Sequence, residues 1–528
     1  MTTTIRRAAS PWAVLAICCC SLLLVGIDIT IVNIALPTIR RDLHSSLSGL
    51  QWVIDAYSLV LAAMLIFSGS LGDRLGRRRV FLVGLIAFTA ASLACGLAPT
   101  LGWLVAFRIV QAVGGSMLNP VAMSIIVNAF QEPGARARAI GVWAAVVGLS
   151  MALGPLVGGA LVSSAGWRWI FWVNVPVGLA AVALTARWIP ESRAPRPRRF
   201  DPLGQVLVAV GLGSLTYAII AVPRSGWTAP TTVGLFILAA TATAALLVVE
   251  RRRRDPLIEL RFFRSVPFTS ATVCAVAAFV AMGTFLFANT LYLQDELGLS
   301  PFAAGVRTLP MAGLAAVCAP LSGRLVATAG ARLPLVVSGI ATAVGAALLV
   351  PIDPRTSTPH LLVAYALIGL GFGLVNAPIT NAATSGMPRE QAGVAAAIAS
   401  TSRQVGMSLG VAVSGSLIAG TAGGLPSALP AVWWLVVGCG VGIAALGVLG
   451  TTSRAQASAA AVLAPEPEEH REPVRTGNPT RGVGAAAGLH GCALDQGKAA
   501  RASGTGGRYR PRQGACPDAT GTRVAEPR

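Results

Sequence analysis

Long apolar stretches, each of helix length, follow one another from near the first residue to about residue 450. A helix that crosses the hydrocarbon core of a bilayer needs about 20 predominantly apolar residues. Fourteen stretches meet this requirement: 12–37, 48–71, 80–98, 101–127, 138–163, 168–189, 203–222, 230–250, 267–292, 303–328, 332–351, 360–382, 393–420 and 428–450. Only 12% of the residues are charged, against about 25% in soluble domains. The sequence therefore predicts an all-α, polytopic membrane protein with fourteen transmembrane helices.

Arginines gather on alternate connections between these stretches. One side of the predicted membrane carries Arg6, Arg7, Arg74, Arg77, Arg78, Arg79, Arg136, Arg138, Arg193, Arg196, Arg198, Arg199, Arg251–Arg254, Arg261 and Arg264. The other side has little beyond Arg40, Arg41, Arg168, Arg224 and Arg355. Positive charge marks cytoplasmic connections, so both termini are expected to be cytoplasmic. The net charge of +20 then reflects topology, and no nucleic-acid partner is expected.

Several features of the composition limit the class of protein. Lysine occurs once, at Lys498, and this bias toward arginine suggests a GC-rich bacterial genome and a place in the bacterial cytoplasmic membrane. The nine cysteines and four histidines show no metal-binding spacing. No phosphate-binding Gly-x-x-x-x-Gly-Lys-[Ser/Thr] string is present. We therefore expect neither a metal nor a cofactor.

An internal repeat divides the chain. Residues 115–120 (Gly-Ser-Met-Leu-Asn-Pro) and 373–378 (Gly-Leu-Val-Asn-Ala-Pro) each place glycine five residues before proline near a helix end. Repeated halves with a substrate site between them are a transporter design. The predicted parts are a cytoplasmic N-terminus (1–11), a six-helix half (12–190), two inserted helices with basic loops (191–266), a second six-helix half (267–450) and a disordered cytoplasmic tail (451–528).

Two charged residues lie deep within the predicted spans of the first half. Asp28 is in the middle of 12–37, where a carboxylate is costly unless it has a function or a partner. It can carry a proton or bind a cationic substrate, or simply be hydrogen-bonded to a neighbouring helix. Arg108 lies in 101–127 with Gln111 on the same face, and its charge needs an acid or backbone carbonyls from the first two spans.

Other polar residues within spans are candidates for a substrate cavity. They are Asn33, Asp55, Gln111, Asn289, Asn376 and Arg403. Asp55 lies near the outer end of its span, where an acid can also reach water. The second half contains no acid in the middle of a span.

Two glycine-rich strings complete the candidates. The first is a loop of Gly69, Gly72, Asp73, Arg74, Gly76, Arg77 and Arg78. Its arginines are explained by topology alone, but the ordered glycines and the aspartate are not. The second is Gly154, Pro155, Gly158 and Gly159 within 138–163. Its small residues permit close helix approach, and its proline interrupts the helical hydrogen bonds.

Five strings together resemble the major facilitator superfamily, and within it the fourteen-helix drug:proton antiporter family of multidrug and antibiotic exporters. They are 28–37, 69–79, 108–115, 154–159 and 167–178. The resemblance covers about 12–450. Two positions depart from it, since Ser150 and Ala112 stand where glycine is usual.

The resemblance implies the major facilitator fold and a set of roles. Asp28 would couple proton and substrate, with assistance from Arg108. Asp73 and its loop would lock the cytoplasmic side during alternating access. Pro155 and the neighbouring glycines would shape the exchange step.

The predicted function is proton-coupled export of small organic molecules such as drugs or antibiotics, by a protein sufficient as a monomer. A dedicated exporter of one endogenous metabolite, such as a self-made antibiotic or siderophore, remains an alternative. A membrane-embedded transferase is a remote one, because His44, His360, His470 and His490 all fall in predicted loops or the tail and no paired carboxylates occur. Without an acid in the second half, neutral, anionic or monocationic substrates are favoured over dications.

Overall fold

The computed structural model describes residues 10–193, 201–253, 260–384 and 392–463, and these residues form helices and no strand. The predicted N-terminus up to residue 9 and the tail beyond residue 463 lie outside them. The elements are α1 (Pro11–Asp42), α2 (Leu47–Leu75), α3 (Arg77–Gly96), α4 (Leu101–Ala129), α5 (Pro133–Ala165), α6 (Trp169–Trp172), α7 (Asn174–Trp188), α8 (Pro202–Ser225), α9 (Pro230–Arg252), η1 (Leu260–Arg264), α10 (Val266–Leu291), η2 (Tyr292–Glu296), α11 (Pro301–Arg307), α12 (Leu309–Ala329), α13 (Arg332–Leu349), α14 (Thr358–Thr384), α15 (Ala392–Gly420), α16 (Gly424–Leu449) and α17 (Ser453–Leu463).

Within the described ranges, twelve helical segments are long and apolar enough to cross a membrane, which makes the chain a multi-pass membrane protein. They coincide with twelve of the predicted stretches. The other two stretches, 138–163 and 393–420, fall on α5 and α15, which are continuous helices of 33 and 29 residues. Two stretches are divided: 168–189 into α6 and α7, and 303–328 into α11 and α12. Helix α17 was not expected, since the sequence after residue 450 predicts no regular structure.

Side-chain caps and prolines set several helix starts. The side chains of Ser46, Asp201 and Ser300 each accept a hydrogen bond from the backbone N–H three residues later. Pro202 and Pro301 follow two of these caps in the first helical turn. Proline suits this position because the N–H it lacks would have no helical partner there. These caps and prolines explain where α2, α8 and α11 begin.

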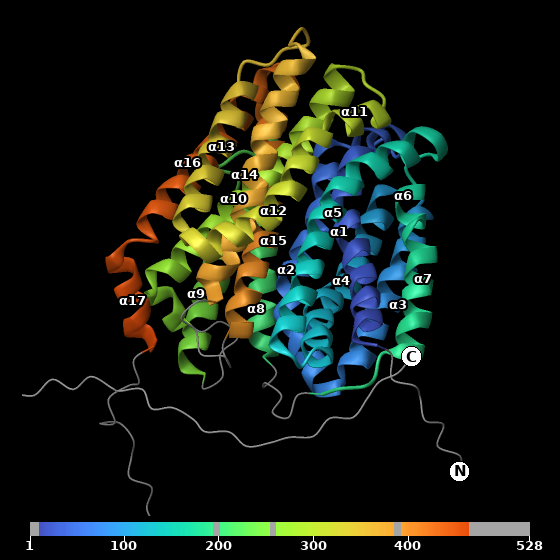
Figure 1. Ribbon diagram of the computed structural model, residues 1–528. Helices are drawn as coiled ribbons and strands as arrows, with labels where there is room; N and C mark the ends of the chain where they lie inside the picture. Colours follow the sequence, from blue (N-terminus) through green and yellow to red (C-terminus); the bar gives the residue numbers. More distant parts are fainter. Residues whose placement is uncertain (1–9, 194–200, 254–259, 385–391, 464–528) are drawn as a thin grey trace, which may run out of the picture. The chain divides into compact units, whose positions relative to one another are not determined.

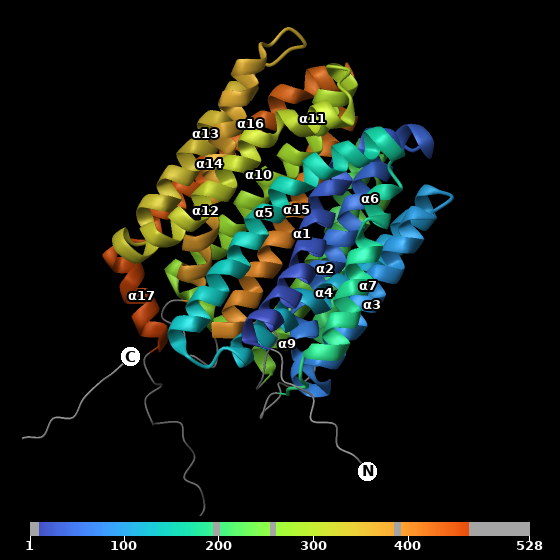
Figure 2. The ribbon, with the colours of Figure 1, turned by 45° about the vertical axis from the view of Figure 1, so that its right-hand side comes forward.

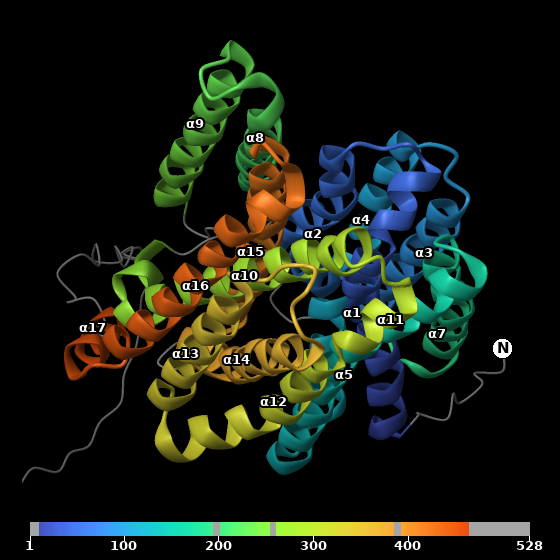
Figure 3. The same cartoon turned by 90° about the horizontal axis from the view of Figure 1, so that it is seen from above.

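The helices form two groups with separate apolar cores. Helices α1–α5 and α7 enclose one core around Phe81 and Phe88, and α10–α14 and α16 enclose most of another around Phe285, Tyr365 and Trp433. The two groups lie side by side in Figures 1 and 2. The α8–α9 hairpin lies to one side, with α8 packed on α2 and α15 and α9 outermost (Figure 3).

The surface where the two groups meet, called the seam here, is formed by α1, α2 and α5 against α10, α11, α12 and α15. A third apolar core crosses it and joins Val53 of α2 to Phe287 of α10 and Val411 of α15. We call the end of the bundle that holds the α2–α3 turn the basic end. The seam is fastened at the opposite end.

Hydrogen bonds across the seam lie at that opposite end. Gln51 of α2 donates from Nε2 to the carbonyls of Val411 and Ala412 at 3.3 and 2.9 Å. Gln294 of η2 donates to the carbonyl of Ile34 in α1 at 2.8 Å. Amide donors paired with backbone carbonyls fix the two groups at specific positions, which apolar packing alone does not do.

Candidate functional site

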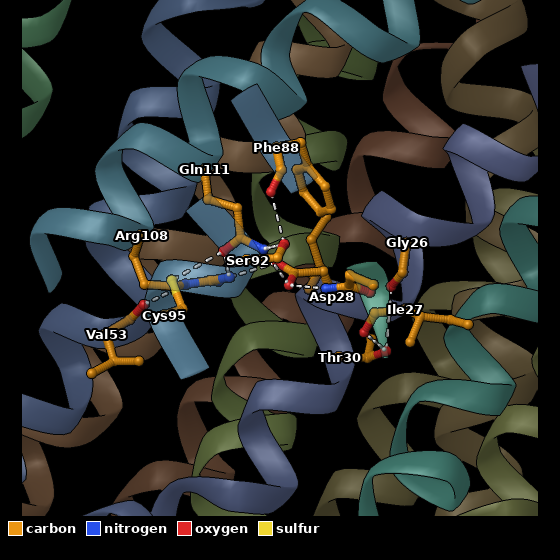
Figure 4. Close-up of polar contacts among 12 residues, drawn as sticks. Gly26, Ile27, Asp28, Thr30, Val53, Phe88, Ser92, Cys95, Arg108 and Gln111 are labelled. Atoms are coloured by element: carbon orange, nitrogen blue, oxygen red, sulfur yellow. Dashed lines mark hydrogen bonds and ion pairs between the residues drawn. The ribbon is translucent and has the colours of Figure 1, made fainter. Parts of the chain in front are cut away.

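Asp28 lies near the middle of α1 and forms a buried ion pair with Arg108 of α4. Its Oδ2 is 2.5 Å from Arg108 Nη1, and both side chains are at most 2% exposed. Gln111, one turn after Arg108, donates to Asp28 Oδ1 at 2.8 Å and accepts from Arg108 Nη1 at 2.7 Å. Asn174, at the start of α7, donates to the same Oδ1 at 3.2 Å. Figure 4 shows Asp28, Arg108 and Gln111 converging.

The remaining surface of the Arg108 guanidinium is also covered. Its Nε donates to the carbonyl of Val53 in α2 at 3.2 Å. The ring of Tyr57, one turn further along α2, lies 4.0 Å from its Cζ, in cation–π geometry. Three helices of one group therefore hold this cation.

The arrangement lets a proton and a guanidinium compete for one carboxylate. An ionised acid deep in a membrane protein is tolerated when it is paired and fully hydrogen-bonded, and both oxygens of Asp28 are. Protonation of Asp28 would remove the charge that attracts Arg108 and free its Nη1 for another acceptor.

Asp55 is a second buried acid, and its surroundings differ. It lies in α2, is fully buried, and faces the seam, where the Ser408 hydroxyl of α15 is its polar neighbour. Among the described residues, no hydrogen bond of normal geometry reaches either of its carboxylate oxygens. Asp55 therefore stands apart from the Asp28 cluster, across from the other group of helices.

Two predicted cavity asparagines do not join the Asp28 cluster. Asn33 is buried in α1 but donates to the carbonyl of Ile29 in its own helix at 3.1 Å. Asn289 of α10 accepts a hydrogen bond from the Tyr365 hydroxyl of α14 at 2.5 Å, inside the second core. Both amides are used locally, within one group of helices.

The remaining predicted cavity residues lie on α14 and α15. Asn376 donates to the carbonyl of Phe372, one turn back in its own helix, at 3.3 Å. Arg403 donates to the hydroxyls of Thr380 and Ser400 at 2.6 and 3.4 Å. Neither residue contacts Asp28, so of the six predicted cavity residues only Gln111 belongs to the cluster.

The glycine loop between α2 and α3 closes on residues that follow α7. Gly76 has φ of +114°, a conformation that favours glycine, and the Glu191 carboxylate occupies the space where a Cβ would lie. Glu191 accepts from the backbone N–H of Arg78 at 3.1 Å, while the Arg78 side chain donates to a carbonyl near the end of α7. Asp73 pairs with Arg77, four residues later, at 2.9 Å.

The other predicted residues of this loop lie on the last turns of α2. A Cβ on Gly72 would come within 2.9 Å of Val121 in α4, whereas one on Gly69 would make ordinary contact with Pro120 at 3.5 Å. Arg74 is exposed in the last turn. Close packing on α4 therefore requires glycine at Gly72 and only permits it at Gly69.

The glycines of α5 bring that helix against α1. A Cβ on Gly154 would overlap the Thr30 hydroxyl, and one on Gly158 would lie 2.6 Å from Ile31 and Ile34. Such distances are shorter than side-chain packing allows. The small residues thus set how close α5 approaches the helix that carries Asp28.

The same segment of α5 also meets α11 across the seam. A Cβ on Gly159 would lie 2.5 Å from the carbonyl of Pro301, and one on Gly305 would strike the carbonyl of Pro155. Backbone therefore packs on backbone here. The proline–glycine string contacts both groups of helices at once.

Several members of the site were not among the predicted candidates. Ser92 accepts from Gln111 at 2.8 Å, and nothing in its sequence context distinguishes it from other serines in spans. Asn174 and Tyr57 are polar residues within apolar stretches, a signal that could have been used. Gln51, which donates across the seam, carries the same signal.

Comparison with known proteins identifies the family. A sequence model of the Major Facilitator Superfamily matches residues 18–411. The chain belongs to this superfamily. A solved structure of a D-xylose-proton symporter has the same fold, with a TM-score of 0.61 at 13% identity, covering 84% of this chain and 98% of the symporter.

Relatives of this chain with higher identity are named for resistance and export. The multidrug resistance protein Stp of Mycobacterium tuberculosis is 37% identical over 75% of this chain and 74% of its own length. The tetracenomycin C resistance and export protein of Streptomyces glaucescens is 39% identical over 78% and 77%. The multidrug efflux pump LfrA of Mycolicibacterium smegmatis is 33% identical over 79% and 82%. Family and relatives point to a transporter of small molecules and not to an enzyme.

Proposed function

We propose that this protein is a proton-coupled exporter of small organic molecules, drugs or antibiotics among them. The observation that carries the proposal is the buried Asp28–Arg108 pair, because it gives one protonatable group inside the bundle a competing partner. The resistance and export proteins among its relatives support the direction of transport.

Coupling would work through the Asp28 carboxyl. When Asp28 is ionised it holds Arg108 and Gln111. When it takes up a proton, both are released, and the contacts of α1 with α4 weaken. Since α5 packs on α1 through Gly154 and Gly158 and on α11 across the seam, a shift of α1 would be felt at the boundary between the halves.

The proposed topology has fourteen transmembrane helices. Helices α5 and α15, with 33 and 29 residues, are long enough to cross as well. The six-helix halves would be 12–190 and 267–450, with 191–266 as an inserted hairpin and basic loops. With the basic end in the cytoplasm of a bacterial cell, residues 1–11 and 451–528 would be cytoplasmic. The halves would rock about a central site, as a monomer.

In that orientation the seam is closed on the outer side. The hydrogen bonds of Gln51 and Gln294 would hold this closed state. The Gly69–Arg78 loop would act at the cytoplasmic side, where the Asp73–Arg77 pair and Gly76 fix its conformation. Asn33, Asp55, Gln111, Asn289, Asn376 and Arg403 remain our candidates for the cavity that opens when the halves move.

A dedicated exporter of one endogenous metabolite is the second candidate. It is favoured by one relative named for export of a single antibiotic, tetracenomycin C, in Streptomyces glaucescens. The two candidates share the same coupling site and differ only in the breadth of the cavity.

Transport by the purified protein in liposomes tests the proposal. A pH gradient is imposed, and the movement of a panel of dyes and antibiotics is recorded together with proton flux for wild type, Asp28→Asn and Asp42→Asn. Asp42 is the matched control, because it is on the same helix but is half exposed and pairs with Arg168. We expect gradient-driven transport in wild type and Asp42→Asn, and its loss in Asp28→Asn.

Other outcomes separate the parts of the proposal. Transport by Asp28→Asn at the wild-type rate and with the same proton flux would leave export standing and remove Asp28 as the coupling group. Transport of a single compound from a wide panel would favour the dedicated exporter.

A further inference from the structure

A groove of about 790 Å³ lies between the α8–α9 hairpin and α2, at the end of the bundle opposite the basic end. It is lined by the first turns of α2, the last turns of α8 and the first half of α9. It lies outside the helices that surround Asp28. The substrate path between the halves therefore does not account for it.

The groove exists because α9 packs mainly on α8. Helix α8 rests on α2 and α15, while α9 stands further out (Figure 3). The side chains of α9 that are buried by protein are few: Thr232, Ala239, Ala242 and Glu250. A wedge is left between α9 and α2, and Gly234, with no atom near its missing Cβ, opens it further.

The chemistry of the groove changes along its length. Arg224 lines it where α8 ends, and within the described part of the chain this guanidinium has no hydrogen bond or ion pair. Ser225 and Thr231 lie beside it in the lining. Leu235 and Leu238 continue the lining along α9 toward the middle of the bundle.

Aromatic side chains mark the depth at which this change occurs. Trp52 of α2 and Tyr217 of α8 line the groove with ring centroids 5.5 Å apart. Tryptophan and tyrosine concentrate at the level of lipid headgroups. Arg224 lies in the last turn of α8, and Leu235 and Leu238 lie one to two turns into α9, so we infer that the cationic end of the groove faces headgroups and the leucine end faces acyl chains.

We propose that this groove binds one phospholipid with an anionic headgroup, from the leaflet that meets this end of the bundle. Its phosphate pairs with Arg224, no cation in the headgroup offsets the charge of that phosphate as choline would, and its acyl chain lies along Leu235 and Leu238 between α9 and α2. A free phosphate would leave the leucine part unfilled, and a purely apolar molecule would leave Arg224 without an anion. The lipid fills the wedge and attaches the hairpin to the bundle.

Native mass spectrometry of the full-length protein tests the lipid site. Delipidated protein is titrated with phosphatidylglycerol or with phosphatidylcholine of the same acyl chains. We expect one phosphatidylglycerol to be retained in preference to phosphatidylcholine. Arg224→Ala should lower the affinity for phosphatidylglycerol about tenfold, as expected for one lost charged hydrogen bond. Arg355→Ala, which removes an equal charge from an exposed loop at the same end, should leave it unchanged.

A second pair of variants locates the lipid. Gly234→Trp places a large side chain in the groove and should abolish retention. Gly213→Trp on α8 also enters open space but is not in the lining, so it should retain the lipid. Equal retention of both lipids, or equal effects of Arg224→Ala and Arg355→Ala, would overturn the proposal. So would retention by a folded Gly234→Trp, or displacement of the lipid by a transported drug. If Gly234→Trp does not fold, the comparison of Arg224→Ala with Arg355→Ala tests the proposal by itself.

Discussion

Asp28 and Asp55 are both buried acids in the first half of the chain, but they differ in their hydrogen-bond partners and in the helices that they face. Asp28 is held by Arg108, Gln111 and Asn174 within one group of helices. Asp55 has no hydrogen bond of normal geometry among the described residues and faces α15 of the other group. An acid within a rigid group can keep permanent partners. An acid at the boundary between two groups of helices loses its neighbours on the other group when the groups move apart. The protonation of such an acid can therefore be coupled to the opening and closing of the boundary.

The largest effect should come from removing the partner of Asp28. Arg108→Ala leaves the buried Asp28 carboxylate without its cation, held only by the Gln111 and Asn174 amides, and should destabilise the protein by about 3–5 kcal/mol. Thermal unfolding in detergent, followed with a thiol dye that reacts with the buried cysteines, measures the loss. The double variant Asp28→Asn with Arg108→Gln should recover much of it. If Arg108→Ala is as stable as wild type, the Asp28–Arg108 ion pair does not contribute to stability.

Replacing each of the two acids by leucine should change the stability of the protein in opposite directions. Asp55→Leu replaces an unpartnered polar group with an apolar one and should raise stability by about 1–3 kcal/mol. Asp28→Leu leaves Arg108 without its acid and should lower stability by a similar or larger amount. The same unfolding measurement compares them. Equal losses would show that Asp55 has a partner as important as Arg108.

The third prediction concerns pH. Closing the seam over an ionised, unpartnered Asp55 is costly, so closure should require its protonated form and become harder as pH rises. Its polar neighbours at the seam are Ser408 and Gln51. Of the arginines on helices that pack on α2, Arg108 of α4 is occupied by Asp28 and Arg403 of α15 is bound to hydroxyls. Counterflow of substrate without a pH gradient should therefore slow several-fold at alkaline pH in wild type and less in Asp55→Asn. Identical pH profiles would remove Asp55 from the closing step.

The smallest effect should come from Ser408. Ser408→Ala removes the polar neighbour of Asp55 across the seam, and without a well-formed hydrogen bond the cost should stay below about 1 kcal/mol. Gln51→Ala is the matched comparison on the same surface, because its two hydrogen bonds to α15 are well formed. A larger loss for Ser408→Ala than for Gln51→Ala would show that Ser408 does bind Asp55.

The apolar stretches predicted the helices well because the bilayer requirement acts on local sequence. Every predicted stretch coincides with a helix, and only details such as the division of 303–328 were missed. The break at Thr308 comes two residues before Pro310, and proline is favoured in the first turn of a helix because its missing N–H needs no partner there. Helix α17 was missed because its sequence lacks the length and hydropathy on which the prediction rested.

The sequence by itself determined the membrane class and the presence of Asp28, Arg108 and Gln111 in the spans. It did so because the hydropathy of a stretch, and the position of a charged residue within that stretch, can be read directly from consecutive residues. Only the tertiary structure decided that Gln111, Ser92 and Asn174 surround Asp28, that Asp55 faces the other group, and that Asn33 does neither. Those outcomes depend on the rotation and approach of helices distant in sequence. Glycines such as Gly154 permit that close approach, but the local sequence does not show which residue of the other helix, here Thr30, lies against them.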